Sequence, residues 1–508
     1  METAPLDSFP TPVSRIPRPD SPTVVGRPLS NKPSDFGDDR WRVGVSRSDI
    51  GRRVPPIDFT VVPERWRRTA KLMTYAYINR SPYPGKMPHH TSSAYALTRH
   101  LRFFWTFLDE RGRKNLDAVT QTDLDAFLCW LQCHPSAYSD SPVQQANALR
   151  AVKALHDYRE FLEDAITINP WRGRSIARLV GVRSGGENKT ARIPEQISEP
   201  LLAWARLYVE TASSDILACR TEVEAFVRSH DQPFSYSSDR RKVVEWAAER
   251  VKSGQGLPKL SKWTLTPELN LEQPDLPFIR RLAGLPPRSR AGMSKSLRAD
   301  LDSLPLAPGG LATPMSTDPA TGEPWRTPMH ELDVPLEVKA LRTACLILIF
   351  ALTGMRSDEV FALERGCHSV KRSQDGLLNR HVLEGRTFKS RSMEGASAAW
   401  ITVEPVARAV SVLEELTPSR EICSFQKTRH YWDPAAPLHH MTVEVFNRDL
   451  RDFITWVNIE RFSQTTATAG RGAIPATVNG EAFVVSTRSF RRTLAWYIAN
   501  RRDCPRFG

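Results

Sequence analysis

The chain has 508 residues, of which 40% are hydrophobic and 25% are charged; this is ordinary for a globular protein and excludes wholesale disorder. Lysine and arginine total 70 against 57 aspartate and glutamate residues, and the formal charge of +13 favours a polyanionic partner, either nucleic acid or an anionic surface. No apolar run approaches the roughly 20 residues of a membrane-spanning helix, and the first residues lack the basic and apolar regions of a secretory signal.

The first segment, residues 1–62, is predicted to be a flexible, proline-rich arm. Eight prolines fall within the first 33 residues, and neither a helical nor a strand period survives that density. The sequence leaves two uses open for this arm, a passive tail and a segment that touches DNA.

A helical domain is predicted over residues 63–168. Apolar residues recur every three or four positions between Tyr95 and Leu108. Thr120 and Asp123 match a capping box at the start of the next helix, and a third helix carries the apolar residues from Leu149 onwards. A segment of about a hundred residues with this pattern predicts a compact helical bundle.

Residues 169–196 are predicted to be a basic linker between two domains. Within residues 171–192, six lysines and arginines face a single acid, Glu187. A basic crossing of this kind suits contact with the phosphates of a duplex, although a merely solvated linker is the alternative. The residues expected to contact DNA are Arg172, Arg174, Arg178 and Arg183.

The rest of the chain, residues 197–508, is predicted to form a second domain with an irregular insertion at about 253–330. A buried helix is expected through LRTACLILIFAL, followed by two β-segments at His381–Lys389 and Ala398–Val403. Further helices are expected at Val406–Leu416, Thr442–Arg461 and Ser489–Ala499. The predicted fold class is mainly α with a small β-sheet.

Basic residues at structured positions are the candidate chemical groups. Arg356 follows the buried helix just after Gly354, and Glu359 can reach back to orient its guanidinium. Taken alone, this pattern also matches a surface arginine with an i+3 partner. Lys389 ends the first β-segment, where a lysine can reach a phosphate or is simply solvated.

A second pair of arginines opens the last predicted helix. Arg488 and Arg491 are three residues apart and share a face, whereas Phe490, Leu494 and Ile498 form the apolar face. The first turn of a helix with two arginines on one side is suited to binding phosphate. No phosphate loop, metal-binding helix or ligand cluster accompanies them, and Cys129 with Cys133 predicts two core thiols rather than a metal site.

Together these segments resemble the tyrosine recombinase family of phage-type site-specific integrases. TGMRSDEV resembles the family's first arginine box, RSFRRTLA resembles its second box, and GRTFKS followed by AAWITV resembles the hairpin that carries the catalytic lysine. The helical segment at 63–168 resembles the core-binding domain of the DNA clamp, and residues 197–508 resemble the α+β catalytic domain.

The resemblance implies a mechanism that uses neither metal nor cofactor. A tyrosine would attack the scissile phosphate to give a 3′-phosphotyrosyl link and a free 5′-hydroxyl. Arg356 and Arg491 would neutralise charge on the phosphate oxygens, and Lys389 would protonate the leaving oxygen. Glu359 would support Arg356.

The sequence departs from the family pattern at two points. Arg488 stands where the family usually has histidine, and we expect it to bind phosphate because a guanidinium cannot act as a neutral base. Only 17 residues follow Arg491, and Tyr497 lies within the same predicted helix, too early to be the nucleophile. No nucleophile is therefore assigned, and the sequence suggests a truncated or frame-shifted integrase that binds DNA but does not cleave it alone.

The expected function is that of a DNA-binding site-specific integrase from a mobile genetic element. It would act on double-stranded DNA, self-associate there, and reside in the cytoplasm with the nucleoid, since seven scattered cysteines indicate reduced thiols. The alternative is a non-enzymatic DNA-binding regulator derived from an integrase. A basic scaffold for RNA or proteins is a third possibility, which the core-like spacing of the aromatic residues in RFFWTF disfavours.

Overall fold

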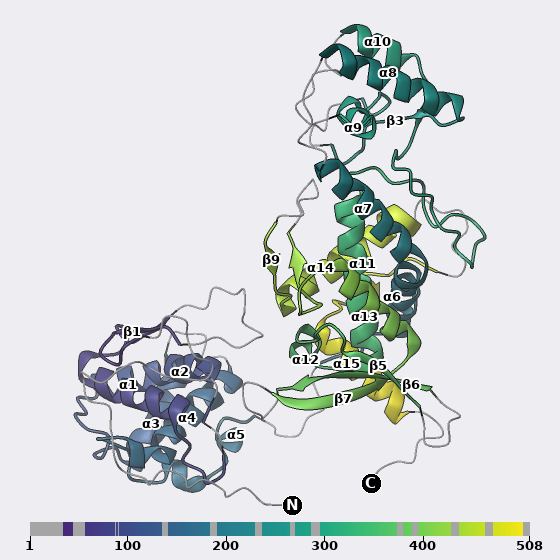
Figure 1. The fold of residues 1–508 in the computed structure, drawn as a ribbon. Coiled ribbons are helices and arrows are strands. Elements are labelled where there is room, and N and C mark those ends of the chain that lie inside the picture. The colour runs from purple at the N-terminus through teal and green to yellow at the C-terminus, as the bar shows by residue number, and fades with distance from the viewer. Residues whose placement is uncertain are drawn as a thin grey trace, which may run out of the picture. The chain divides into compact units, whose positions relative to one another are not determined.

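A computed structural model shows a mainly helical chain with small sheets, in agreement with the predicted class (Figure 1). It divides into two compact units, one formed by the described residues up to 182 and the other by those from 190 onwards. The structure describes residues 34–43, 56–86, 88–89, 91–134, 141–182, 190–228, 236–264, 270–285, 295–372, 379–388, 395–427, 436–462 and 471–500.

The first unit is a helical bundle preceded by a short antiparallel strand pair. Its elements are β1 (Arg40–Trp41), β2 (Ile57–Asp58), α1 (Glu64–Asn79), α2 (Thr91–Glu110), α3 (Gln121–Cys133), α4 (Pro142–Asp157), η2 (Arg159–Phe161), η3 (Pro170–Gly173) and α5 (Ile176–Leu179).

The predicted capping box at the start of α3 is confirmed. The backbone N–H of Asp123 donates to Oγ1 of Thr120, and the N–H of Thr120 donates to the Asp123 carboxylate at 2.9 Å. The core of the first unit is rich in aromatic residues. Trp66 stacks on Trp105 at 5.5 Å between ring centroids, and Phe104 packs against Phe127. Cys129 and Cys133, predicted to be core thiols, are exposed because they lie on the outer side of α3.

The predicted boundaries of this unit were too narrow at both ends. Phe36, Trp41 and Phe59 belong to the segment predicted as a flexible arm, yet all three are buried in the first core. Trp171 and Ile176, predicted to be linker, are buried in the same core. The first domain thus extends beyond residues 63–168 at both ends, because large apolar side chains from the flanking segments are buried against the helical bundle.

The second unit contains the other elements. They are α6 (Glu195–Leu207), η4 (Tyr208–Ala212), α7 (Ser213–Arg228), α8 (Tyr236–Lys252), β3 (Leu257–Pro258), α9 (Leu276–Leu282), α10 (Lys295–Asp302), β4 (Leu306–Ala307), α11 (Val334–Thr353), α12 (Ser357–Phe361), β5 (His368–Arg372), β6 (Asn379–Thr387), β7 (Ala396–Thr402), α13 (Glu404–Leu416), β8 (Phe425–Gln426), β9 (Leu438–His439), α14 (Val443–Trp456), η7 (Val457–Arg461), β10 (Thr477–Val478), β11 (Glu481–Ala482) and α15 (Thr487–Ala499).

Helix α11 is the centre of this unit. Every residue from Ala340 to Phe350 is buried, and α6, α7, α13, α14 and α15 pack around it (Figure 1). A helix that is apolar on all sides must be enclosed in this way, which is why the uniform run in the sequence predicts a central helix.

The sheet of the second unit has three antiparallel strands in the order β5–β6–β7. Its β6–β7 pairing runs from His381 opposite Thr402 to Thr387 opposite Ala396, which agrees with the two predicted β-segments. Lys389 and residues 390–394, which lie between these two strands, are outside the described residues.

The insertion predicted as irregular at about 253–330 is partly a small folded lobe. Helices α8, α9 and α10, with the parallel pair β3–β4, enclose a separate core that includes Val243, Leu257, Ile279 and Leu301. Helical patterning near Arg240–Lys252 predicts α8, but α9 and α10 were missed because they are only 7 and 8 residues long and lie between segments that contain glycine and proline. Between β4 and α11, residues such as Trp325 and Met329 instead join the main core.

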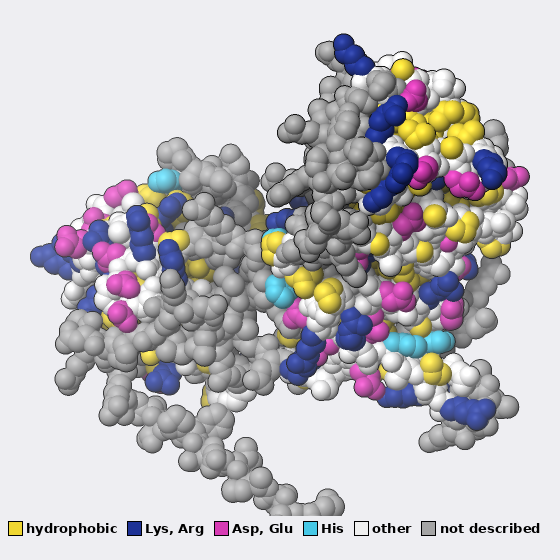
Figure 2. Space-filling model, turned by 45° about the horizontal axis from the view of Figure 1, so that its top comes forward, with side chains coloured by type: hydrophobic (Ala, Val, Ile, Leu, Met, Phe, Trp, Pro, Cys, Tyr) yellow, Lys and Arg dark blue, Asp and Glu magenta, His cyan; other side chains and the backbone are white. Residues whose placement is uncertain are grey.

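Charged side chains of both signs are visible on the face seen in Figure 2. Among the described residues on that face, lysine and arginine are interspersed with aspartate and glutamate, and no large area carries only positive charge. No helix in the described parts of the chain is both long and apolar enough to cross a membrane.

Candidate phosphate-binding site

The candidate site begins where α11 ends. Gly354 adopts a left-handed backbone with φ of 64° and stops the helix. A Cβ added at this position would lie 3.1 Å from Cδ2 of Leu494 on α15, so the turn and α15 are in close contact. Glycine suits both the left-handed backbone and the close contact with α15, since it adopts positive φ freely and has no side chain.

Arg356 lies at the N-cap of α12, and Glu359 holds it there. The Glu359 carboxylate is 2% exposed and accepts the backbone N–H of Arg356 at 2.7 Å and Nη1 of its guanidinium at 2.9 Å. The contact predicted between these two residues is therefore present. The Arg356 side chain is about one-third exposed, so its guanidinium is oriented yet open to a ligand.

The end of strand β6 meets the same carboxylate. The Thr387 hydroxyl donates to Oε1 of Glu359 at 2.9 Å, which ties β6 to the start of α12. Sequence reasoning missed Thr387, and its place two residues before Lys389 was the only signal available. Lys389 itself is not among the described residues.

Helix α15 supplies the other two arginines. Its first turn is closed by Ser486 and Ser489, whose side chains and backbone N–H groups form a reciprocal capping box. Arg488 and Arg491 are exposed, and neither forms an ion pair with any residue the structure describes. Two uncompensated guanidiniums on the first turns of a helix favour an anion nearby.

Helix α15 packs against α11 and the α11–α12 turn on both sides of Arg491 in the sequence. Phe490 stacks on Phe350 of α11 at 6.2 Å between centroids, and Leu494, one turn after Arg491, contacts Gly354. The predicted apolar face is present at Phe490 and Leu494 but wrong at Ile498, which is 53% exposed. The fold thus brings together the chain segments of Arg356, Thr387 and Arg491.

Asp358 on α12 and Tyr497 on α15 both have raised pKa values. Burial raises the pKa of Asp358, which directly follows the α12 N-cap region, and the neighbouring Glu359 carboxylate adds to this effect. The Tyr497 hydroxyl donates to Glu195 at 3.1 Å, and burial with this bond raises its pKa. Tyr497 is six residues after Arg491 and so lies on a different face of α15.

The predicted DNA contacts of the linker belong to the first unit. Arg172, Arg174 and Arg178 are exposed, and Nε of Arg174 donates to the carbonyl of Trp171 at 3.2 Å. Trp171 and Arg172 both have positive φ, an uncommon conformation for such residues that fixes the direction of the chain here. Arg183 lies outside the described residues.

Within the parts of the chain that the structure describes, no group of three or more histidine, cysteine, aspartate or glutamate side chains could hold a metal ion. Comparison with known proteins found no matching family model, no similar curated protein and no similar solved structure.

Proposed function

We propose that this protein binds double-stranded DNA as a protein of the tyrosine recombinase type, with a backbone phosphate held between Arg356 and Arg491. The observation that carries the proposal is the meeting of three segments, the α11–α12 turn, the end of β6 and the start of α15. Each segment resembles a different part of that family's catalytic site.

The roles of the residues follow from their surroundings. Arg356 is held by a buried carboxylate, so its guanidinium is preorganised for two parallel hydrogen bonds to phosphate oxygens. Arg491 and Arg488 are exposed and unpaired among the described residues, and they add charge from a helix start. Lys389 is proposed as the general acid on the resemblance alone.

The first unit is proposed as the other DNA-contacting part. Arg172 and Arg178 are exposed and form no ion pair with a described residue, whereas Arg174 approaches Asp125 at 3.8 Å. Arginines of this kind bind phosphates without reading sequence. We also propose that copies of the chain associate with each other on DNA, as the resemblance implies.

The binding proposal is tested by fluorescence anisotropy with labelled duplex DNA over a series of salt concentrations. Arg356→Ala and Arg491→Ala should each weaken binding and reduce the dependence of log K on log salt by about one. Arg420→Ala is the matched control, since Arg420 is exposed and, among the described residues, forms its ion pair with Glu364. Unchanged affinity and salt dependence in both test variants would refute the phosphate site.

A non-enzymatic DNA-binding regulator is the second candidate, and the position of Tyr497 favours it. This tyrosine shares a helix with Arg491, but its hydroxyl is engaged by Glu195. The two candidates separate on the arginine pair. Weaker DNA binding by Arg356→Ala and Arg491→Ala supports the recombinase-type phosphate site, whereas unchanged binding in both variants supports the regulator. A protein–DNA adduct that survives SDS would overturn the expectation that this chain does not cleave DNA alone.

A further inference from the structure

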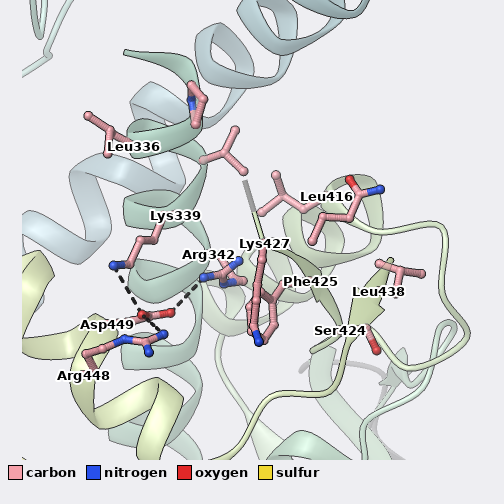
Figure 3. A pocket seen from close by; sticks show the side chains of 13 residues that line it. Leu336, Lys339, Arg342, Leu416, Ser424, Phe425, Lys427, Leu438, Arg448 and Asp449 are labelled. Carbon is pink, nitrogen blue, oxygen red and sulfur yellow. Dashed lines mark hydrogen bonds and ion pairs between the residues drawn. The ribbon is translucent and has the colours of Figure 1, made fainter. Parts of the chain in front are cut away.

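A pocket of about 220 Å³ lies between the first half of α11, the end of α13, the β8–β9 pair and α14 (Figure 3). Arg342, which lines it, is three helical turns before the end of α11 at Thr353, a distance of about 16 Å. The pocket is therefore separate from the candidate phosphate-binding site.

One buried carboxylate holds three cations at one side of this pocket. Asp449 is 1% exposed and accepts from Nη2 of Arg342 at 2.8 Å, and it also pairs with Lys339 and Arg448 at 3.4 and 3.3 Å. Figure 3 shows these three side chains converging on Asp449. The carboxylate is thus shared among more positive charge than it can neutralise.

Arg342 has donors to spare in this position. Its guanidinium carries five N–H donors, but Nη2 to Asp449 is the one hydrogen bond it makes with the described residues. Its Nε is buried without a hydrogen-bond partner, and the residue is only 7% exposed. The guanidinium also packs on the Phe425 ring at 4.4 Å from the centroid, which fixes its plane.

Lys427 adds a fourth positive charge to the lining of the pocket (Figure 3). It is exposed and forms no ion pair with a described residue. Four cations and one carboxylate, that of Asp449, line the pocket. Asp452 adds a second negative charge nearby, because it pairs with Lys339. These six charged groups together leave a net charge of +2. The remaining walls include the apolar side chains of Leu336, Leu416 and Leu438.

We propose that this pocket binds a small organic anion, with its acidic group between Arg342 and Lys427 and its apolar part against Leu416 and Leu438. The volume is below the roughly 300 Å³ at which pockets for drug-sized ligands begin, so the apolar part should be about the size of one ring. A purely structural Arg342–Asp449 pair would join α11 to α14, but it would not account for the unused donors or for Lys427.

The test is isothermal titration of the full-length chain with four probes. Benzoate and phenyl phosphate carry an acidic group on one ring, inorganic phosphate lacks the ring, and benzyl alcohol lacks the charge. The proposal expects saturable binding of benzoate, phenyl phosphate or both, at least fivefold tighter than inorganic phosphate, and none for benzyl alcohol. Whichever of the two ring-bearing anions binds better identifies the acidic group as carboxylate or phosphate.

Variants assign the binding to this pocket. Lys427→Gln and Leu438→Asp change exposed side chains, so they should fold normally and weaken the better probe at least fivefold. Arg342→Met should abolish binding where the variant folds. Lys371→Gln is the control, because Lys371 is an exposed lysine on β5 paired with Glu384. Absence of saturable binding by either ring-bearing anion, or unchanged affinity in both Lys427→Gln and Leu438→Asp, would overturn the proposal.

Discussion

Arg356 and Thr387 share one acceptor, since Nη1 of the arginine and the threonine hydroxyl both donate to Oε1 of Glu359 at 2.9 Å. The buried carboxylate oxygen therefore connects the guanidinium proposed to bind phosphate with the end of strand β6, at a residue 28 positions after Glu359. The position of Arg356 depends on the sheet as well as on its own helix.

We expect Thr387→Val to destabilise the second unit and loosen Arg356. The change removes one hydrogen bond to a buried carboxylate, which typically costs about 1.5–3 kcal/mol of unfolding free energy. DNA affinity should fall modestly, because Glu359 keeps both contacts with Arg356. Urea unfolding and DNA anisotropy measure the two effects. Thr387→Ser retains the hydroxyl and is the control, so equal losses in both variants would contradict the role given to this bond.

Gly354→Ala should also destabilise the second unit, for two separable reasons. A residue with a Cβ is strained at φ of 64°, by roughly 1 kcal/mol, and the new Cβ would press on Leu494. In a Leu494→Ala background the steric part disappears, so the cost of Gly354→Ala should be smaller there. Urea titrations of the wild type, the two single variants and the double variant measure this coupling. An equal loss of unfolding free energy on Gly354→Ala in both backgrounds would show that the contact with Leu494 does not affect stability.

The sequence predicts best where the signal is local. The Thr120–Asp123 capping box depends on four consecutive residues, and α11 on an uninterrupted apolar run, so both are confirmed. The bond between Thr387 and Glu359 could not be predicted, because it arises only when the sheet packs against α12. No periodicity in either segment contains that information.

The errors have a common physical origin. Trp41 and Trp171 lie in segments rich in proline, glycine or charge, which indicate loops, but each buries a large ring in the first core. Burial of a few aromatic side chains outweighs local composition. The pocket around Arg342 escaped prediction for another reason, since its walls come from α11, α13, α14 and the β8–β9 pair.

A buried charge network should matter more to stability than any surface pair. Glu337 is fully buried on α11 and pairs with Arg326 and Arg461, while its Oε2 accepts from the Tyr208 hydroxyl at 2.9 Å. Glu337→Gln leaves buried guanidiniums without full compensation, and we expect a loss of about 3–5 kcal/mol.

Chemical denaturation checks this expectation against a surface carboxylate. Glu364 pairs with the exposed Arg420, so Glu364→Gln should cost no more than about 1 kcal/mol. If Glu337→Gln and Glu364→Gln lose similar amounts of unfolding free energy, the buried network does not contribute more to stability than the surface pair.

The first unit should lose stability as the solution becomes acidic, because of His100. This residue is 8% exposed, and burial, with a smaller effect of the Arg99 charge, lowers its pKa from 6.5 to about 4. Between these values the unfolded chain binds a proton at His100 and the folded chain does not. Stability is therefore complete above pH 6.5 and is lost as the pH falls towards 4.

The size of this effect follows from the separation of the two pKa values. Each pH unit is worth about 1.4 kcal/mol, so acidification to pH 4 should remove on the order of 3 kcal/mol through His100. Urea unfolding of the full chain, followed by a probe of the first unit at several pH values, measures the slope. His100→Gln should flatten the curve between pH 4 and 6.5. A wild-type slope retained in His100→Gln would assign the acid sensitivity to other groups.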